Sequence, residues 1–271
     1  MMRSLAQTAL AGGLVLVPGA LATPVLAAET TPAADSAFSG LYLGTFGAYR
    51  AVANTVDYTY TGEATYTSGY SPVSDTLSGT GHVSNALSDI GLGFELGLNA
   101  VGDTGLFLGA DLRAAVSPMG GDTAAEGITG TFNCTSCAYT SVTNWTATTA
   151  LADARVRFGV TADDWLIYVA AGLGLAEVRS EDTLRATLED ETPGLTIIDH
   201  SLLTGWSVGA GFERMIDDHL ALTFGYRYAD YGTLATTPAV ALIDSMQSGS
   251  ATMERHLVDQ TITVGWAYHF H

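Results

Sequence analysis

The sequence predicts an all-β fold, an eight-stranded antiparallel transmembrane β-barrel with four long extracellular loops. Three observations predict it. Apolar residues recur at every second position in eight segments, and the connections between these segments alternate between short and long. Beyond the N-terminus, no stretch approaches the ~20 apolar residues that a spanning helix needs. Short turns at one end and long loops at the other are the layout of a transmembrane barrel.

The N-terminus has the pattern of a secretory signal peptide, which we predict for residues 1–27. Arg3 supplies the positive start, an apolar stretch follows, and small residues lead to a cleavage position after Ala27 or Ala28. An uncleaved membrane anchor is the alternative. Residues 28–37 are rich in Ala, Pro and acidic residues and are expected to form a flexible lead-in. The barrel is therefore assigned to residues 38–271.

The charge of the chain excludes one class of partner. The 271 residues carry a formal net charge of −18, and all ten basic side chains are Arg. Such a surface repels a phosphate backbone, so no nucleic-acid partner is expected.

The connections between the eight segments differ in length and composition. The three short ones are rich in Asp and Gly and lie at Asn99–Thr104, Thr161–Asp164 and Asp217–Asp218. The four long ones are polar and are predicted to be extracellular loops: Thr55–Val83, Ser117–Thr143, Ser180–Ser201 and Tyr231–His256.

Each segment has a bulky apolar face and a face of small residues and charges. In one of them, Ile90, Leu92 and Phe94 alternate with Gly91 and Gly93. A lipocalin-like secreted barrel, apolar inside and wet outside, is the alternative architecture. The interior of an eight-stranded barrel is narrow, however, so the small set fits inside and the bulky set fits lipid.

Charged residues on the small-residue face favour the same orientation. Six acidic side chains and five Arg occur there, although the chain as a whole is strongly acidic. Buried charges must be paired, and Arg suits bidentate pairing with carboxylates. We predict an interior charge network of Arg50, Asp89, Glu95, Asp111, Arg113, Asp153, Arg155, Arg157, Glu213, Arg227 and Asp259.

Aromatic residues gather near both ends of the predicted strands, as in the two aromatic girdles of a membrane barrel. Tyr231 is placed toward the long-loop side with others of this kind. The predicted girdle comprises Phe38, Tyr49, Trp165, Phe212, Tyr228, Trp266, Tyr268 and Phe270.

Several segments resemble a known family. The opening Phe38–Gly44 (FSGLYLG) resembles the entry strand of small OmpA-like and opacity-type outer-membrane barrels. Gly205–Arg214, with Asp217–Leu222 and Gly225–Gly232, resembles a hairpin of the porin-family immunogenic outer-membrane proteins of α-proteobacteria. Val264–Phe270 resembles the C-terminal strand that barrel-assembly machinery recognises. The resemblance implies an outer-membrane location in a Gram-negative envelope. It also allows haemin as a ligand, since some relatives bind haemin.

Chemistry-bearing residues are few. Cys134 and Cys137 lie in the second long loop, where an intraloop disulfide is predicted, with a metal site, free thiols or a redox motif as alternatives. Ser201 beside His200, and Ser84 near His82, are hydrolase candidates by proximity alone. Adjacent strand residues face opposite ways, which disfavours the first pair. We predict no catalytic site, no metal site and no cofactor.

The sequence therefore predicts a non-enzymatic integral outer-membrane barrel with an envelope-structural and surface-presenting role. The alternatives are a weak or gated porin and a surface protein that binds haemin or a host ligand. Expected partners are outer-membrane lipid, lipopolysaccharide and the barrel-assembly machinery. The face assignment also predicts that Phe94→Arg or Val208→Arg blocks insertion, whereas Gly97→Ser is better tolerated.

Overall fold

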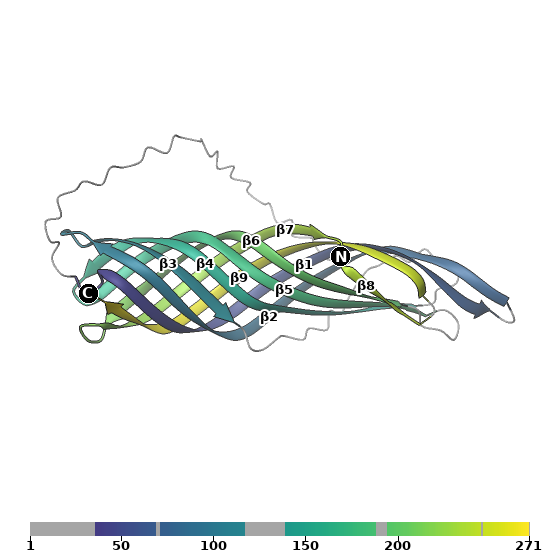
Figure 1. Cartoon of the computed structure of the whole chain (residues 1–271), viewed down its shortest axis with the longest axis horizontal. Helices are drawn as coiled ribbons and strands as arrows, with labels where there is room; N and C mark the ends of the chain where they lie inside the picture. Colours follow the sequence, from purple (N-terminus) through teal and green to yellow (C-terminus); the bar gives the residue numbers. More distant parts are fainter. Residues whose placement is uncertain (1–35, 69–70, 117–138, 188–193, 245, 271) are drawn as a thin grey trace, which may run out of the picture. The chain divides into compact units, whose positions relative to one another are not determined.

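The computed structural model describes residues 36–68, 71–116, 139–187, 194–244 and 246–270, all within the second of two compact units, Ala33–His271. These residues form one antiparallel sheet of long strands (Figure 1). Among them, none belongs to a helix able to cross a membrane. The predicted signal peptide falls outside the described residues.

The sheet contains nine strands. They are β1 Gly40–Ser68, β2 Ser71–Val101, β3 Leu106–Val116, β4 Tyr139–Ala162, β5 Trp165–Thr187, β6 Gly194–Met215, β7 Leu220–Thr236, β8 Ala239–Ile243 and β9 Met246–Phe270.

Eight of the strands close into a ring. The order is β5-β4-β3-β2-β1-β9-β7-β6, and a further pairing of β5 with β6 completes the circle. The last strand pairs with the first, starting at Phe270 opposite Leu41. The short β8 lies outside the ring order and pairs with the start of β6. The predicted eight-stranded antiparallel barrel is therefore confirmed.

The register of the ring fixes its tilt. Following partners once around the barrel from Leu96 of β2 returns to β2 at Ala86, ten residues away. Ten residues at ~3.3 Å each, set against eight strands at ~4.8 Å each, give a strand tilt of about 41°. This value lies inside the range of transmembrane barrels, whose strands tilt ~35–45°.

The lower part of the barrel, next to the short turns, carries its large apolar side chains on the outside. Leu173 is 72% exposed and Leu92 is 63% exposed, and the same face of every ring strand is apolar. From Trp165 to Leu175 this face extends over ten residues, or about 25 Å along the axis at the stated tilt. That height matches the apolar band of membrane barrels. We call this part the apolar band.

Above the apolar band the pattern reverses along the same strands. On β1, Leu41 and Leu43 are exposed, whereas Tyr58 and Tyr60 are buried inside the barrel and Thr59 between them is exposed. Apolar side chains on the outside of a barrel indicate that lipid surrounds it. Apolar side chains on the inside, with polar ones outside, indicate that water surrounds it. The reversal therefore marks the height at which the barrel leaves its apolar solvent. Burial also raises the pKa of Tyr60 to about 12.

The predicted long loops are largely wrong as loops. Most of Thr55–Val83, and both ends of Ser180–Ser201, continue the strands as paired β-structure. Much of Tyr231–His256 forms the end of β7, β8 and the start of β9. The second predicted loop lies mostly outside the described residues. Strands persist because Thr, Val and Tyr favour extended backbone and the ladder hydrogen bonds do not depend on lipid.

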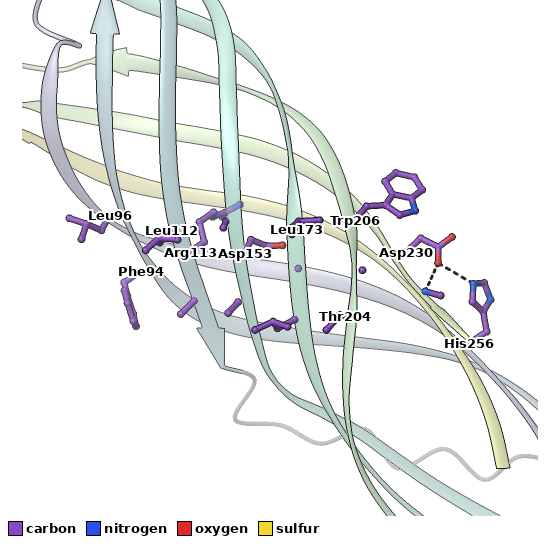
Figure 2. A pocket seen from close by; sticks show the side chains of 17 residues that line it. Phe94, Leu96, Leu112, Arg113, Asp153, Leu173, Thr204, Trp206, Asp230 and His256 are labelled. Carbon is purple, nitrogen blue, oxygen red and sulfur yellow. Dashed lines mark hydrogen bonds and ion pairs between the residues drawn. The ribbon is translucent and has the colours of Figure 1, made fainter. Parts of the chain in front are cut away.

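A β-bulge shapes β7 at the upper edge of the apolar band. The register with β9 shifts between Asp230 and Thr233, and Gly232 adopts a left-handed φ of 64° that suits glycine. The Asp230 carboxylate accepts the backbone N–H of Gly232 at 2.8 Å and lies 3.1 Å from His256 Nε2 (Figure 2). The bulge thus leaves a notch in the outer wall.

The short turns are held by local hydrogen bonds. At the β6–β7 turn, the Asp217 carboxylate accepts the backbone N–H groups of His219 and Leu220 at 2.9 and 2.8 Å. These bonds hold the pKa of Asp217 below its usual value. The turn is an Asx-type turn, which explains an Asp at its start.

A substitution at Gly205 tests how closely β6 and β7 approach each other. A Cβ added there would lie 2.2 Å from the Asp230 carbonyl oxygen, which is backbone and unable to move alone. We expect Gly205→Ala to lower the free energy of unfolding by about 1–3 kcal/mol. Gly47→Ala is the matched control, since its nearest contact would be 3.9 Å away. Urea unfolding of both variants in vesicles measures the difference, and equal stability would show that β6 and β7 are not this close.

Candidate functional site in the barrel lumen

The charged residues predicted for the interior all point into the lumen, and each takes part in at least one ion pair. Ten of the eleven are buried, and Asp89 is half-buried. They divide into two groups at different heights. The first ion cluster consists of Glu95, Asp111, Arg113, Arg155, Arg157 and Glu213. The second ion cluster consists of Arg50, Asp89, Asp153, Arg227 and Asp259.

The first ion cluster balances three carboxylates with three guanidinium groups. Arg155 donates to both oxygens of Asp111 at 2.8 Å, a bidentate pair across β3 and β4. Its Nη2 also lies 3.8 Å from Glu95, which pairs with Arg113 at 3.3 Å. This chain of contacts crosses β2, β3 and β4, so the pairs lock the register of three strands.

Arg157 is the centre of the first ion cluster and is completely buried. Its guanidinium group lies 3.0 Å from Asp111 and 2.5 Å from Glu213, and it donates to Asn99 at 2.8 Å. Three rings surround it, with centroids 4.7–5.2 Å from the guanidinium carbon, and each adds a cation–π contact: Tyr42, Phe107 and Tyr168.

The second ion cluster surrounds two guanidinium groups with three carboxylates. Arg227 donates to Asp153 at 2.7 Å, to Asp259 at 3.0 Å and to the Tyr231 hydroxyl at 2.6 Å. Arg50 approaches the other oxygen of Asp259 at 3.1 Å. Asp259 on β9 therefore links β1 and β7, the two strands that pair with β9.

The predicted charge network leaves out two interior groups, although the alternation in the last strand already places His269 on the inward face. Arg255, whose Nη2 lies 3.6 Å from Asp199 and 2.5 Å from the Ser180 hydroxyl, is buried above the second ion cluster. His269 is buried 3.4 Å from Glu213 and stacks on Tyr42. The signal was present, because Arg255 continues the alternation of β9 into a segment that was predicted to be a loop.

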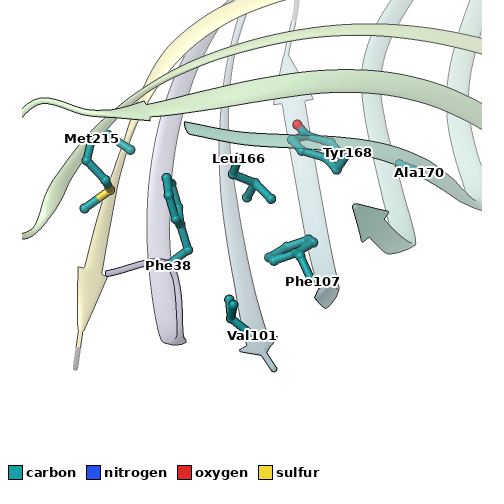
Figure 3. Close-up of a cluster of buried hydrophobic side chains, with 8 residues drawn as sticks. Phe38, Val101, Phe107, Leu166, Tyr168, Ala170 and Met215 are labelled. Atoms are coloured by element: carbon teal, nitrogen blue, oxygen red, sulfur yellow. The ribbon is translucent and has the colours of Figure 1, made fainter. Parts of the chain in front are cut away.

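Apolar side chains fill the lumen below and above the ion clusters. The turn-end plug, drawn in Figure 3, packs side chains from several strands across the mouth beside the short turns. It comprises Phe38, Val101, Phe107, Leu166, Tyr168, Ala170, Met215 and Ala221. The extended-end plug comprises Val52, Leu151, Ala176, Val178, Leu203, Ala229, Tyr231 and Leu257. A cavity of about 20 Å³ lies between the ion clusters, bordered by Arg50, Arg113 and Asp153, and has room for about one water molecule.

Comparison with known families decides what kind of barrel this is. The family model described as "Outer membrane protein beta-barrel domain" matches residues 19–270, nearly the whole chain. The chain belongs to the outer-membrane β-barrel family. Its location is the outer membrane, and the apolar band is the part that crosses it. The porin-family immunogenic subtype stays a prediction.

Solved structures of other barrels resemble this outer-membrane protein only distantly. Neisserial surface protein A is 10% identical, with 82% of this chain and 97% of that chain covered and a TM-score of 0.35. Ail of Yersinia pestis is 11% identical, with coverages of 80% and 98% and a TM-score of 0.33. OprG of Pseudomonas aeruginosa is 11% identical, with coverages of 86% and 97% and a TM-score of 0.39. A search of curated proteins finds no match.

The placement of Phe38 in the outer-membrane girdle is wrong. Its side chain is 1% exposed, belongs to the turn-end plug and meets the His269 ring edge-on at 5.8 Å. The positive φ of Gly40, 97°, allows the chain before β1 to fold across the barrel mouth. Tyr231 also points inward, where it receives the hydrogen bond from Arg227.

The other predicted girdle residues lie on the outer face of the barrel. Trp165 contacts Phe212 at a centroid distance of 5.7 Å near the short turns, and Trp206 contacts Tyr228 at 5.6 Å higher up. Exposed or half-buried are Tyr49, Trp165, Phe212, Tyr228, Trp266, Tyr268 and Phe270.

The hydrolase candidates do not come together as a site. His200 is exposed outside the barrel, whereas Ser201 is buried and donates to Asp199 at 2.6 Å. His82 contacts Asp57 at 2.6 Å on the outer surface, and Ser84 lies two residues further along β2. Within the described ranges, no group of three or more His, Cys, Asp or Glu side chains is arranged to hold a metal ion. Cys134 and Cys137 lie outside the described residues.

Proposed function

We propose that this outer-membrane protein is a non-conducting, non-enzymatic barrel that stabilises the envelope. The parts of its strands above the apolar band, here called the strand extensions, are presented outside the cell. The filled lumen is the observation that carries the proposal. Two apolar plugs and two ion clusters occupy the interior, and an aqueous path would have to displace both kinds of packing. Eight-stranded barrels have room for little more than their own side chains.

The strand extensions supply the surface for presentation. Above the apolar band, the outward face of β1, β2 and β9 is polar, with exposed Asp57, His82 and Glu254 among Thr and Ser side chains. Long connections of such barrels face the exterior and short turns face the periplasm. The chain carries a net charge of −18, so an acidic, hydroxyl-rich surface is what a neighbouring cell or molecule would meet.

Planar-bilayer recording tests the proposal. Mature wild-type protein, refolded and inserted, is expected to give no discrete conductance steps. The double variant Phe107→Ala/Leu203→Ala thins both plugs and is expected to give at least brief openings, which shows that the assay detects flow through this barrel. Regular steps from the wild type would contradict the proposal and establish the weak or gated porin instead.

The partners follow from the same proposal. Outer-membrane lipid and lipopolysaccharide cover the apolar band, and barrel-assembly machinery recognises the C-terminal strand ending at Phe270. Haemin or a host molecule as ligand of the extensions stays a prediction. A haemin titration that shifts the Soret band of the wild type at stoichiometric concentration would favour that alternative role.

A further inference from the structure

A groove of about 1110 Å³ crosses the outer wall of the barrel (Figure 2). Leu96, Leu112 and Leu173 border it along one row of partners, and Ala114 and Ala152 lie in the next row. Its lining is mostly apolar, and most of its side chains face outward. Arg113 and Asp153, whose side chains belong to the ion clusters, also border it between outward-facing neighbours. The alanines form a low floor between bulkier neighbours.

The groove climbs through the membrane because the strands are tilted. It begins at Phe94 and Leu96 on β2 and ends at Asp230 and His256 on β7 and β9. Six ladder steps of ~4.8 Å at a tilt of about 41° raise it by about 19 Å along the barrel axis. Half of a hydrocarbon core measures about 15 Å. The groove therefore leads from near the middle of the bilayer to its outer surface.

The two ends of the groove differ in chemistry. Phe94 at the lower end is 59% exposed and surrounded by Leu and Ala. At the upper end, Thr204 lines the groove beside the hydrogen-bonded pair of His256 and Asp230, and a Cβ added at Gly232 would meet nothing within 4 Å. The β7 bulge thus opens the upper end toward polar groups, which is the layout that an amphiphile with one apolar tail requires.

We propose that this groove holds one acyl chain of an outer-leaflet membrane lipid, with the lipid headgroup beside Thr204 and His256. The chain runs down the alanine floor and ends near Phe94. Contact with side chains on both edges and below gives this lipid more buried area than a lipid on the convex wall, so it exchanges more slowly. The site is independent of the closed lumen and goes beyond the structural role proposed above.

Lipid retention tests the site. Wild-type barrel is reconstituted in dimyristoyl phosphatidylglycerol vesicles, extracted into dodecyl maltoside, washed by gel filtration and weighed by native mass spectrometry. We expect one retained lipid per barrel. Ala154→Phe, which fills the groove, is expected to reduce retention about tenfold. Ala110→Phe is the matched control, because Ala110 is also exposed on the apolar band but lies outside the groove.

Two results would overturn the site: equal retention by Ala154→Phe and Ala110→Phe, or no retained lipid on the wild type, which means annular lipid only. If Ala154→Phe fails to fold, Ala152→Leu replaces it with the same expectation. A second readout is exchange of a lipid spin-labelled on its chain. A slowly exchanging fraction in the wild type that disappears when the groove is filled supports the proposal, and a single fast fraction in both contradicts it.

Discussion

Phe94→Arg and Val208→Arg are expected to abolish insertion of the barrel into bilayers. Both side chains lie on the outer face of the apolar band and are 59% and 45% exposed there. An Arg on the lipid-facing side near the middle of the membrane costs ~2–4 kcal/mol. The total stability of a folded domain is only ~5–15 kcal/mol, so this cost is a large fraction of it. Refolding yield into vesicles, followed by the mobility difference between heated and unheated protein, measures the effect.

The matched control places the same side chain on the same strand system outside the membrane. Thr80→Arg lies on the outer face of β2 above the apolar band, where the side chain is exposed to water. It is expected to insert with the wild-type yield. Equal yields for Phe94→Arg and Thr80→Arg would show that the band does not face lipid. Gly97→Ser is unsuitable as the benign control expected from the sequence, because a Cβ there would meet the Tyr42 ring at 2.3 Å.

Arg157→Met is expected to be the most destabilising single change in the lumen. Met fills a similar volume but leaves Asp111 and Glu213 without their shared guanidinium group. Removing one partner of a buried ion pair costs ~3–5 kcal/mol, because the remaining charge is left without compensation. Equilibrium urea unfolding in vesicles is the measurement. The variant is expected to unfold at a clearly lower urea concentration than the wild type.

Arg179→Met provides the comparison for that loss. Arg179 pairs with Glu177 at 3.0 Å, but the two side chains are 48% and 41% exposed. Exposed pairs contribute ~0–1 kcal/mol. We therefore expect Arg157→Met to lower the free energy of unfolding much more than Arg179→Met, although both replace an Arg by a Met. Similar unfolding curves would mean that the first ion cluster adds nothing to stability.

The fold and the face assignment could be predicted because period-two patterning is local. Inside the apolar band, lipid and a narrow lumen demand opposite residue types on successive positions, so residues such as Leu92 and Glu95 were assigned to their faces from the sequence alone. The opposite signs of neighbouring interior charges, Arg113 opposite Asp153 for example, could be anticipated for the same reason.

The strand extensions could not be predicted from apolar residues on the outward face, because water and not lipid surrounds this part of the barrel. Once a strand leaves the lipid, the apolar positions move to the inside, and the outward Thr and Ser resemble a polar loop. Val56 and Tyr58 are apolar residues that point inward above the apolar band, so a search for outward apolar residues does not find them. Arg255 was missed for the same reason.

Phe38 could not be placed because its position depends on a backbone turn rather than on alternation. Gly40 allows the preceding residues to fold into the lumen, and the residue pattern of β1 does not predict this turn. The lipid groove likewise depends on the register of seven strands and on the bulge at Gly232. Such features arise from long-range pairing, which a single sequence does not display.

The central claim is that the bulky apolar face meets hydrocarbon and the charged face meets a filled lumen. Spin labels at Ile262 and Val264, on a background with both Cys replaced by Ser, test it most directly in reconstituted vesicles. The account predicts high accessibility to oxygen and low accessibility to a water-soluble nickel chelate at both positions, with the lumen positions Thr261 and Thr263 shielded from both reagents. Strong chelate accessibility and weak oxygen accessibility at Ile262 and Val264 would contradict it.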